Sequence, residues 1–250
     1  MTDDGGMSLR EAWHTISPQP DSDHGPLPPM LVLLTLGSGL VDAFSYLALG
    51  HVFVANMTGN VVFLGFALAG VGEFDVWRSL LGLTAFTGGA VLSARAMRRF
   101  APHRGRMALV AMLVQLPVTV AAAIVGLAAP HPYAGLPAAV LIGVLAAALG
   151  FQNAAVRALG VPDLTTTVLT RTLTAIAAES RWAGGPGGRS GRRMVSILSM
   201  FAGAFAGALL VDRGHPDWVL VVASIVLAFV AVTAVRAARS TQRWVSAHVA

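Results

Sequence analysis

The chain has 250 residues, of which 55% are hydrophobic and 12% are charged, and it contains no cysteine. Runs of about 18 or more apolar residues recur along it, and each is long enough to cross roughly 30 Å of hydrocarbon. This pattern excludes a water-soluble domain, because too few polar residues remain to cover a core containing all of those runs. The absence of cysteine excludes a disulfide framework and thiolate chemistry.

Residues 1–29 are rich in acidic residues and proline and lack the apolar core of a signal peptide, so we expect a mobile acidic tail there. A polytopic membrane domain follows over residues 30–237, and residues 238–250 form a C-terminal tail. The domain contains eight apolar segments, at residues 30–49, 61–71, 80–97, 107–128, 136–158, 168–178, 194–211 and 218–237. The second and sixth are short for a crossing, and each follows an extended or turn-like stretch.

The 17 basic residues are all arginine, and they decide the topology. Twelve of them cluster between residues 95 and 106, between 181 and 193, and between 236 and 243, beside apolar segments, where arginine marks cytoplasmic loops. We therefore assign the net charge of +5 to orientation in a bacterial inner membrane and expect no nucleic-acid partner. Alternation of these loops predicts six crossings, with both termini cytoplasmic and the two short segments re-entrant or half-helical.

The two halves of the domain, about 30–128 and about 135–237, resemble one another weakly but in a consistent order. Residues 42–50 align with 152–160, residues 57–60 with 169–172, and residues 86–88 with 201–203. Because each half makes three crossings, the second half must be inserted upside down. We expect an all-α integral membrane fold with about six transmembrane helices and two short re-entrant or half-helices, arranged as two inverted repeats.

Two pairs of strings carry a family resemblance: GLVDAFSYL at residues 39–47 with VFVANMTGN at 52–60, and LGFQNAAVR at 149–157 with TVLT at 167–170. They resemble the signatures of the bacterial YoaK-type family of membrane proteins, also called DUF1275 or UPF0700. The resemblance covers about residues 30–236. It implies an integral inner-membrane protein with about six spans, and it implies no substrate or activity.

Asp42 is an acidic residue well inside the first apolar segment. A carboxylate at that depth binds a proton, pairs with a cation or coordinates an ion, which indicates a contact with a coupling ion or a substrate. The alternative is that it braces a broken helix. Arg171 and Arg157 are the candidate partners from the second half.

Asn56, Thr58, Gly59 and Asn60 interrupt the apolar sequence just before the second segment. Amide and hydroxyl groups at the N-terminus of a half-helix, with a glycine allowing close approach, favour an anion or a carbonyl oxygen. The competing interpretation is simple N-capping of that helix, and it is the more probable of the two.

Gln152 and Asn153 occupy the place of Asp42 in the second half, and Thr170 and Arg171 begin the second short segment. A site that is polar on both sides and charged on one suits a solute held between unlike halves. The threonines also fit helix packing in lipid, and Arg171 can extend to the cytoplasmic surface.

Glycines on the third and seventh segments, Gly82, Gly88, Gly89, Gly203 and Gly207, predict close helix contacts. The histidines show no spacing typical of metal ligands, and we expect neither a metal nor a cofactor. Nucleotide-binding and hydrolase motifs are also absent from the sequence.

The leading functional hypothesis is a small secondary transporter or permease for a small polar or anionic solute, without enzymatic activity. The alternatives are an integral-membrane enzyme acting on a lipid or lipid-linked substrate, and a non-catalytic membrane scaffold. The expected partners are the lipid bilayer and the solute, and the sequence leaves a homo-oligomer open.

Overall fold

The computed structural model describes residues 11–17, 22–100, 103–162, 164, 169–180, 183–185 and 190–246, and this part of the chain is helical, without strands. The long helices are α2 (Leu27–Ala48), α4 (Val76–Phe100), α5 (Arg104–Ala128), α6 (Gly135–Leu159), α8 (Ser190–Asp212) and α9 (Pro216–Ala238). The shorter elements are α3 (Met57–Leu68), α7 (Leu169–Ala178) and the 3-10 helix η2 (Arg243–Val245). Residues 11–16, within the segment predicted as a mobile tail, are also helical.

Six helices of the described chain are long and apolar enough to cross a membrane, namely α2, α4, α5, α6, α8 and α9. This confirms the predicted number of crossings and the all-α fold. The two short segments of the sequence correspond to α3 and α7, and α3 is a shorter apolar helix of 12 residues. Large apolar side chains cover the outer faces of the long helices, as in Leu198, Phe201 and Phe229. These surfaces contact the hydrocarbon of the bilayer.

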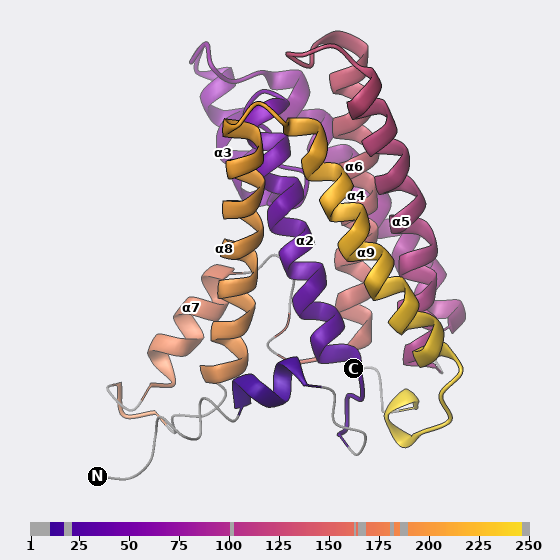
Figure 1. The fold of residues 1–250 in the computed structure, drawn as a ribbon. Coiled ribbons are helices and arrows are strands. Elements are labelled where there is room, and N and C mark those ends of the chain that lie inside the picture. The colour runs from indigo at the N-terminus through magenta and orange to yellow at the C-terminus, as the bar shows by residue number, and fades with distance from the viewer. Residues whose placement is uncertain are drawn as a thin grey trace.

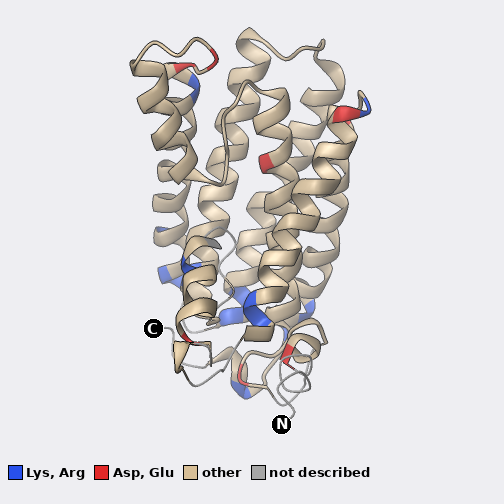
Figure 2. Cartoon of the chain, turned by 90° about the vertical axis from the view of Figure 1, so that its left-hand side faces the viewer, with Lys and Arg blue, Asp and Glu red and all other residues tan. Residues whose placement is uncertain are grey.

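The six long helices form one bundle, with the start of α2 and the end of α9 at the lower end in Figure 1 and α3 at the opposite end. Arginine positions gather at the end where α2 begins and α9 ends, as Figure 2 shows. We call this the arginine-rich end; Arg98, Arg104, Arg192 and Arg236 are among its residues. The other end, called the α3 end, carries Glu73, Asp75 and Asp212 beside Arg78 and Arg213.

The chain doubles back after α2. Gly50 and His51 have positive φ angles of 83° and 56°, a conformation that glycine adopts without strain and that other residues seldom adopt. The backbone amides of Val54 and Ala55 then hydrogen-bond to Asp42, so residues 51–56 run back along α2. Helix α3 then runs back to the α3 end, where α4 begins (Figure 1). Residues 49–75 therefore enter the bundle and leave it at the same end, which makes them a re-entrant segment.

The most buried spans are α2 and α6, with 72% and 61% of their best apolar windows inside the structure. Helix α2 packs on α8 and α9, while α6 packs on α4 and α5, and α5 packs on α9. If α2 is exchanged with α6, α4 with α8 and α5 with α9, the same pairs of helices remain in contact. The inverted repeat itself stays a prediction, and this exchange is the packing that it requires.

Glycines mark two tight helix crossings. A Cβ atom on Gly39 would clash with the carbonyl oxygen of Met200, and one on Gly203 with that of Leu36. The same relation holds between Gly150 and Phe86 and between Gly89 and Ala147. The first crossing joins α2 to α8 and the second joins α6 to α4, so glycines allow close helix approach in the same way at both crossings.

Three other glycines of the predicted set behave differently from one another. A Cβ atom on Gly82 would approach the Asn60 amide, and one on Gly207 would meet Ala43, so both positions lie at contacts. Gly88 has no atom within 4 Å of its Cβ position. The prediction of a close contact was therefore wrong for Gly88, because its neighbour Gly89 is the residue that faces α6.

Candidate functional site

Asp42 fastens the re-entrant segment to α2. Its side chain is 4% exposed, and Oδ1 accepts hydrogen bonds from the backbone amides of Val54 at 3.1 Å and Ala55 at 2.8 Å. The amide of Asn56 also lies near this carboxyl group. Oδ2 is buried and has no hydrogen-bond partner among the described residues. One oxygen therefore braces the backbone, as the alternative interpretation expected, while the other is left for a further partner.

Asn60 fastens the same segment from α3. Its Oδ1 accepts from the backbone N–H of Phe53 at 2.9 Å, and its Nδ2 donates to the backbone carbonyl of Phe53 at 2.6 Å. The side chain is fully buried and lies against Gly82 of α4. Since lipid offers no hydrogen bonds to an extended backbone, Asp42 and Asn60 together supply what residues 53–55 need.

The other predicted site residues around the start of α3, namely Asn56, Thr58 and Gly59, have a different environment. Asn56 precedes α3 but makes no side-chain capping hydrogen bond, and the side chain of Thr58 is exposed. The rings of Phe53 and Phe63 pack together and lie over Gly59. The close approach that this glycine permits is thus made by an aromatic ring of the protein.

In the second half, Gln152 is fully buried on α6, and its Nε2 donates to Ser38 of α2 at 3.1 Å. This bond joins the two most buried helices. Asn153 is partly buried and donates to the carbonyl of Leu149 on its own helix. With the glycine crossings as the guide, Gly39 corresponds to Gly150, and Asn153 is then the counterpart of Asp42.

Thr170 and Arg171 lie on the exposed side of α7, near the arginine-rich end. Among the described residues no ion pair joins Arg171 or Arg157 to Asp42, whose carboxylate faces backbone amides instead. Figure 1 shows α3 and α7 near opposite ends of the bundle. The structure therefore groups Asp42 with Asn56 and Asn60, and it places Thr170 and Arg171 elsewhere. Residues 165–168 lie outside the described chain.

The buried apolar side chains form two clusters. One, with Met30, Met112 and Ala234, lies toward the arginine-rich end; the other, with Phe44, Ala122 and Leu220, lies toward the α3 end. Between them, buried polar side chains occupy the middle of α2 and α5. We call these and the adjacent glutamine of α6 the polar layer: Thr35, Ser38, Gln115, Thr119 and Gln152.

Several of these residues were not among the predicted site residues. Gln115 and Ser38 were missed, although a lone glutamine two residues before Pro117 in an apolar run is a visible signal. Thr172, 8% exposed, was also left out of the site. Its alignment with Asn60 in the internal duplication marked it, because each is a buried polar residue of its short helix.

Five buried side-chain oxygens of the spanning helices have no hydrogen-bond partner in the described structure. They are Oδ2 of Asp42, Oε1 of Gln115, Oε1 of Gln152, and the hydroxyl oxygens of Ser93 and Ser196. Buried polar atoms are almost always paired, and an unpaired one costs about 1–3 kcal/mol. Such atoms mark places where water or a polar solute can bind.

These features define a polytopic α-helical membrane protein with a re-entrant segment and a polar layer in its interior. The chain belongs to the DUF1275 family, described as a protein of unknown function, whose model matches residues 30–233. It is 34% identical over 152 residues to the UPF0700 transmembrane protein YoaK of Bacillus subtilis (strain 168). That alignment covers 60% of this chain and 65% of the relative. No solved structure matches the chain.

Proposed function

We propose that the protein is a small secondary transporter or permease for a small polar or anionic solute. The observation that carries the proposal is the set of unpartnered buried oxygens in the spans, on Asp42, Gln115, Gln152, Ser93 and Ser196. A packed scaffold in lipid gains nothing from such atoms, whereas a pathway for a polar solute needs them. The exchangeable helix pairs add support, because inverted repeats are a common architecture of secondary transporters.

The surroundings of Asp42 favour movement of a solute over chemistry on a lipid. General acid–base catalysis needs a second titratable group or a nucleophile within hydrogen-bond reach. The described partners of the Asp42 carboxylate are backbone amides of residues 54 and 55. We therefore propose a role without catalysis, in which the Oδ2 atom of Asp42 binds a proton or a solute.

The proposed orientation places the arginine-rich end, with both termini, in the bacterial cytoplasm and the α3 end outside the inner membrane. The cysteine-free sequence makes this simple to test with single cysteines. On intact cells, a membrane-impermeant maleimide should label Gly72→Cys, in the exposed loop after α3, and spare Ser246→Cys. The opposite labelling pattern would overturn the orientation.

Transport is tested in proteoliposomes with a panel of small organic anions and polar solutes, by recording charge movement on a solid-supported membrane. We expect a current with at least one solute. Asp42→Asn keeps an Oδ1 acceptor for the amides of Val54 and Ala55 but removes the charge, so the current should fall at least about tenfold while the protein stays folded.

The matched control is Asp212→Asn, which makes the same chemical change at an exposed position of α8. Its transport rate should equal that of the unmodified protein. The proposal fails if no solute in the panel moves, or if Asp42→Asn transports at the unmodified rate.

A further inference from the structure

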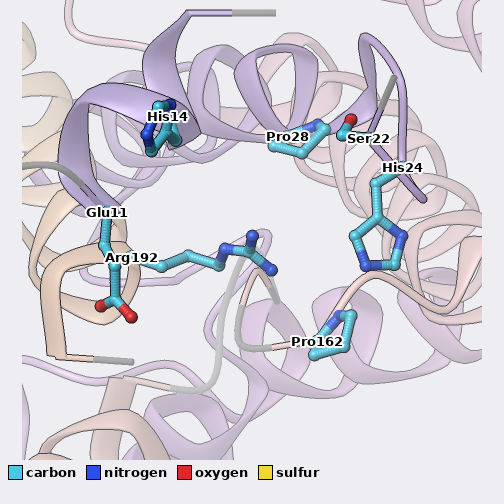
Figure 3. Close-up of a pocket in the computed structure, with 7 residues that line it drawn as sticks. All are labelled: Glu11, His14, Ser22, His24, Pro28, Pro162 and Arg192. Atoms are coloured by element: carbon cyan, nitrogen blue, oxygen red, sulfur yellow. The ribbon is translucent and has the colours of Figure 1, made fainter. Parts of the chain in front are cut away.

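A cavity of about 420 Å³ lies at the arginine-rich end, apart from the polar layer. Figure 3 shows its lining, which comes from the segment before α2, the start of α2, one residue after α6 and the start of α8. The residues are Glu11, His14, Ser22, His24, Pro28, Pro162 and Arg192. Its volume lies within the range of small-molecule sites, about 300–1,000 Å³.

Arg192 supplies the positive charge of this cavity. Its side chain extends from α8 into the open space, and its guanidinium lies toward the middle of the cavity, away from the Glu11 carboxylate at the edge (Figure 3). None of the ion pairs among the described residues includes Arg192; its neighbour Arg193 instead pairs with Glu179 at 2.7 Å. A guanidinium presents several N–H donors in one plane, which fits the oxygens of an oxyanion.

His24 faces the cavity from the other side, and its ring is held by Arg104. The Nη2 atom of Arg104 lies 3.2 Å from Nδ1 of His24. Because arginine can only donate, Nδ1 must accept, and the neutral ring then carries its hydrogen on Nε2. Arg104 itself is 3% exposed and is fixed by the carbonyls of Leu159 and Asp23. The Nε2–H is therefore a preorganised donor.

We propose that this cavity binds a small phosphate-type oxyanion, held by the guanidinium of Arg192 and the Nε2–H of His24. The proposal does not depend on transport, since the site lies outside the polar layer and binding is measured without a gradient. A metal cation is disfavoured, because the described residues contain no group of three or more metal-ligating side chains. The charges of two arginines, Arg104 and Arg192, also act on the ring of His24.

The electrostatics of His24 agree with this assignment. Burial, followed by the charges of Arg104 and Arg192, lowers the pKa of His24, while Asp23 acts in the opposite direction. Glu11 and His14 are the other titratable groups that line the cavity. A bound phosphate would offset the arginine charges and raise the pKa of His24, which histidine NMR can follow with His24→Asn as the assignment variant.

The experiment measures binding of radiolabelled inorganic phosphate to the full chain in phosphatidylcholine nanodiscs by equilibrium dialysis. We expect saturable binding, at least about tenfold weaker in Arg192→Gln, because this variant loses the charge-assisted hydrogen bonds of the guanidinium. Arg239→Gln is the matched control, since Arg239 is exposed at the same end of the bundle and does not line the cavity. It should bind as the unmodified protein does.

A second arm distinguishes the source of the phosphate group. In nanodiscs containing phosphatidylglycerol, undiminished binding of free phosphate identifies a soluble phosphate compound as the ligand. Loss of that binding in the unmodified protein identifies the lipid headgroup as the occupant. Absence of saturable binding in phosphatidylcholine, equal affinity in Arg192→Gln, or an unchanged His24 pKa on adding phosphate would each overturn the site.

Discussion

The two short helices occupy corresponding places in the two halves, yet they are built for different surroundings. Helix α3 is apolar on nearly every side, and Asn60 is its buried residue, while Val61, Phe66 and Leu68 are exposed to the exterior. Helix α7 is amphipathic, with Thr170 and Arg171 exposed and Thr172 buried. A helix of the first kind suits hydrocarbon, and one of the second kind suits a membrane surface.

This difference explains why the buried side chains of Asp42 and Asn60 both bind the segment that leads into α3. The extended residues 51–56 run inside the bundle beside α2, where water cannot satisfy their backbone groups. Asp42 and Asn60 bind that backbone, and an aromatic cluster of Tyr46, Phe53 and Phe63 packs around it. A polar residue inside a span can thus bind the backbone with one atom and leave another atom available to a solute.

The largest effect is expected from Asp42→Ala, which removes the acceptor of two buried amides, those of Val54 and Ala55. Each unsatisfied donor costs about 1–3 kcal/mol, so the free energy of unfolding should fall by about 2–6 kcal/mol. Chemical unfolding in mixed micelles measures this. Arg171→Ala, an exposed change on α7, should stay within about 0.5 kcal/mol. Equal losses in the two variants would mean that Asp42 is no more important to stability than an exposed residue of α7.

A somewhat smaller effect is expected from Asn60→Leu, which leaves the N–H and the C=O of Phe53 without their partner. We expect a loss of about 2–4 kcal/mol in the free energy of unfolding. Thr172→Val, at the aligned position of α7, removes a single hydroxyl and should cost about 1 kcal/mol. If Thr172→Val cost as much as Asn60→Leu, the two helices would be fastened alike, contrary to the structure.

The number of spans and the two short segments were predictable because apolar length is written directly in the sequence. The partner of Asp42 was harder to foresee. It depends on the reversal at Gly50 and His51, which brings the amides of residues 54 and 55 onto a carboxylate more than ten residues earlier in the chain. A carboxylate in an apolar run indicates a partner, but a sequence pattern does not distinguish an arginine from a backbone amide.

The internal duplication stays a prediction, and its alignment differs by one residue from the packing. Aligning residues 86–88 with 201–203 placed Gly88 on Gly203, whereas Gly89 is the α4 residue that makes the kind of close contact that Gly203 makes on α8. Two adjacent glycines look alike in a sequence, and only their direction on the helix separates them. The polar layer was missed for a related reason. Ser38 and Gln115 become buried, and Ser38 binds Gln152, only when α2, α5 and α6 pack together.

A smaller loss of stability is expected at the glycine crossings. Gly39→Ala places a methyl group against the carbonyl oxygen of Met200, and Gly150→Ala places one against that of Phe86. We expect each to lower the free energy of unfolding by about 1–3 kcal/mol, and by similar amounts, since the crossings are equivalent. Gly88→Ala is the control, with free space at its Cβ position. Markedly unequal losses at Gly39 and Gly150 would count against the inverted repeat.

The smallest effect concerns pH and the arginine-rich end. The pKa of His24 is lowered by burial and by Arg104 and Arg192, so the folded protein favours the neutral ring. Below the ordinary pKa of about 6.5, the unfolded chain therefore binds the proton more readily, and stability falls as the pH drops toward the lowered pKa. We expect a small decrease in Tm between pH 7 and pH 5 in phosphate-free buffer. His24→Gln should lose that slope, because an amide side chain does not titrate, while Asn60→Leu should keep it. Asn60 and Asp42 hold the re-entrant segment through bonds to backbone groups. A pH slope that vanished in Asn60→Leu would therefore locate the titrating group at the α3 end instead of at His24.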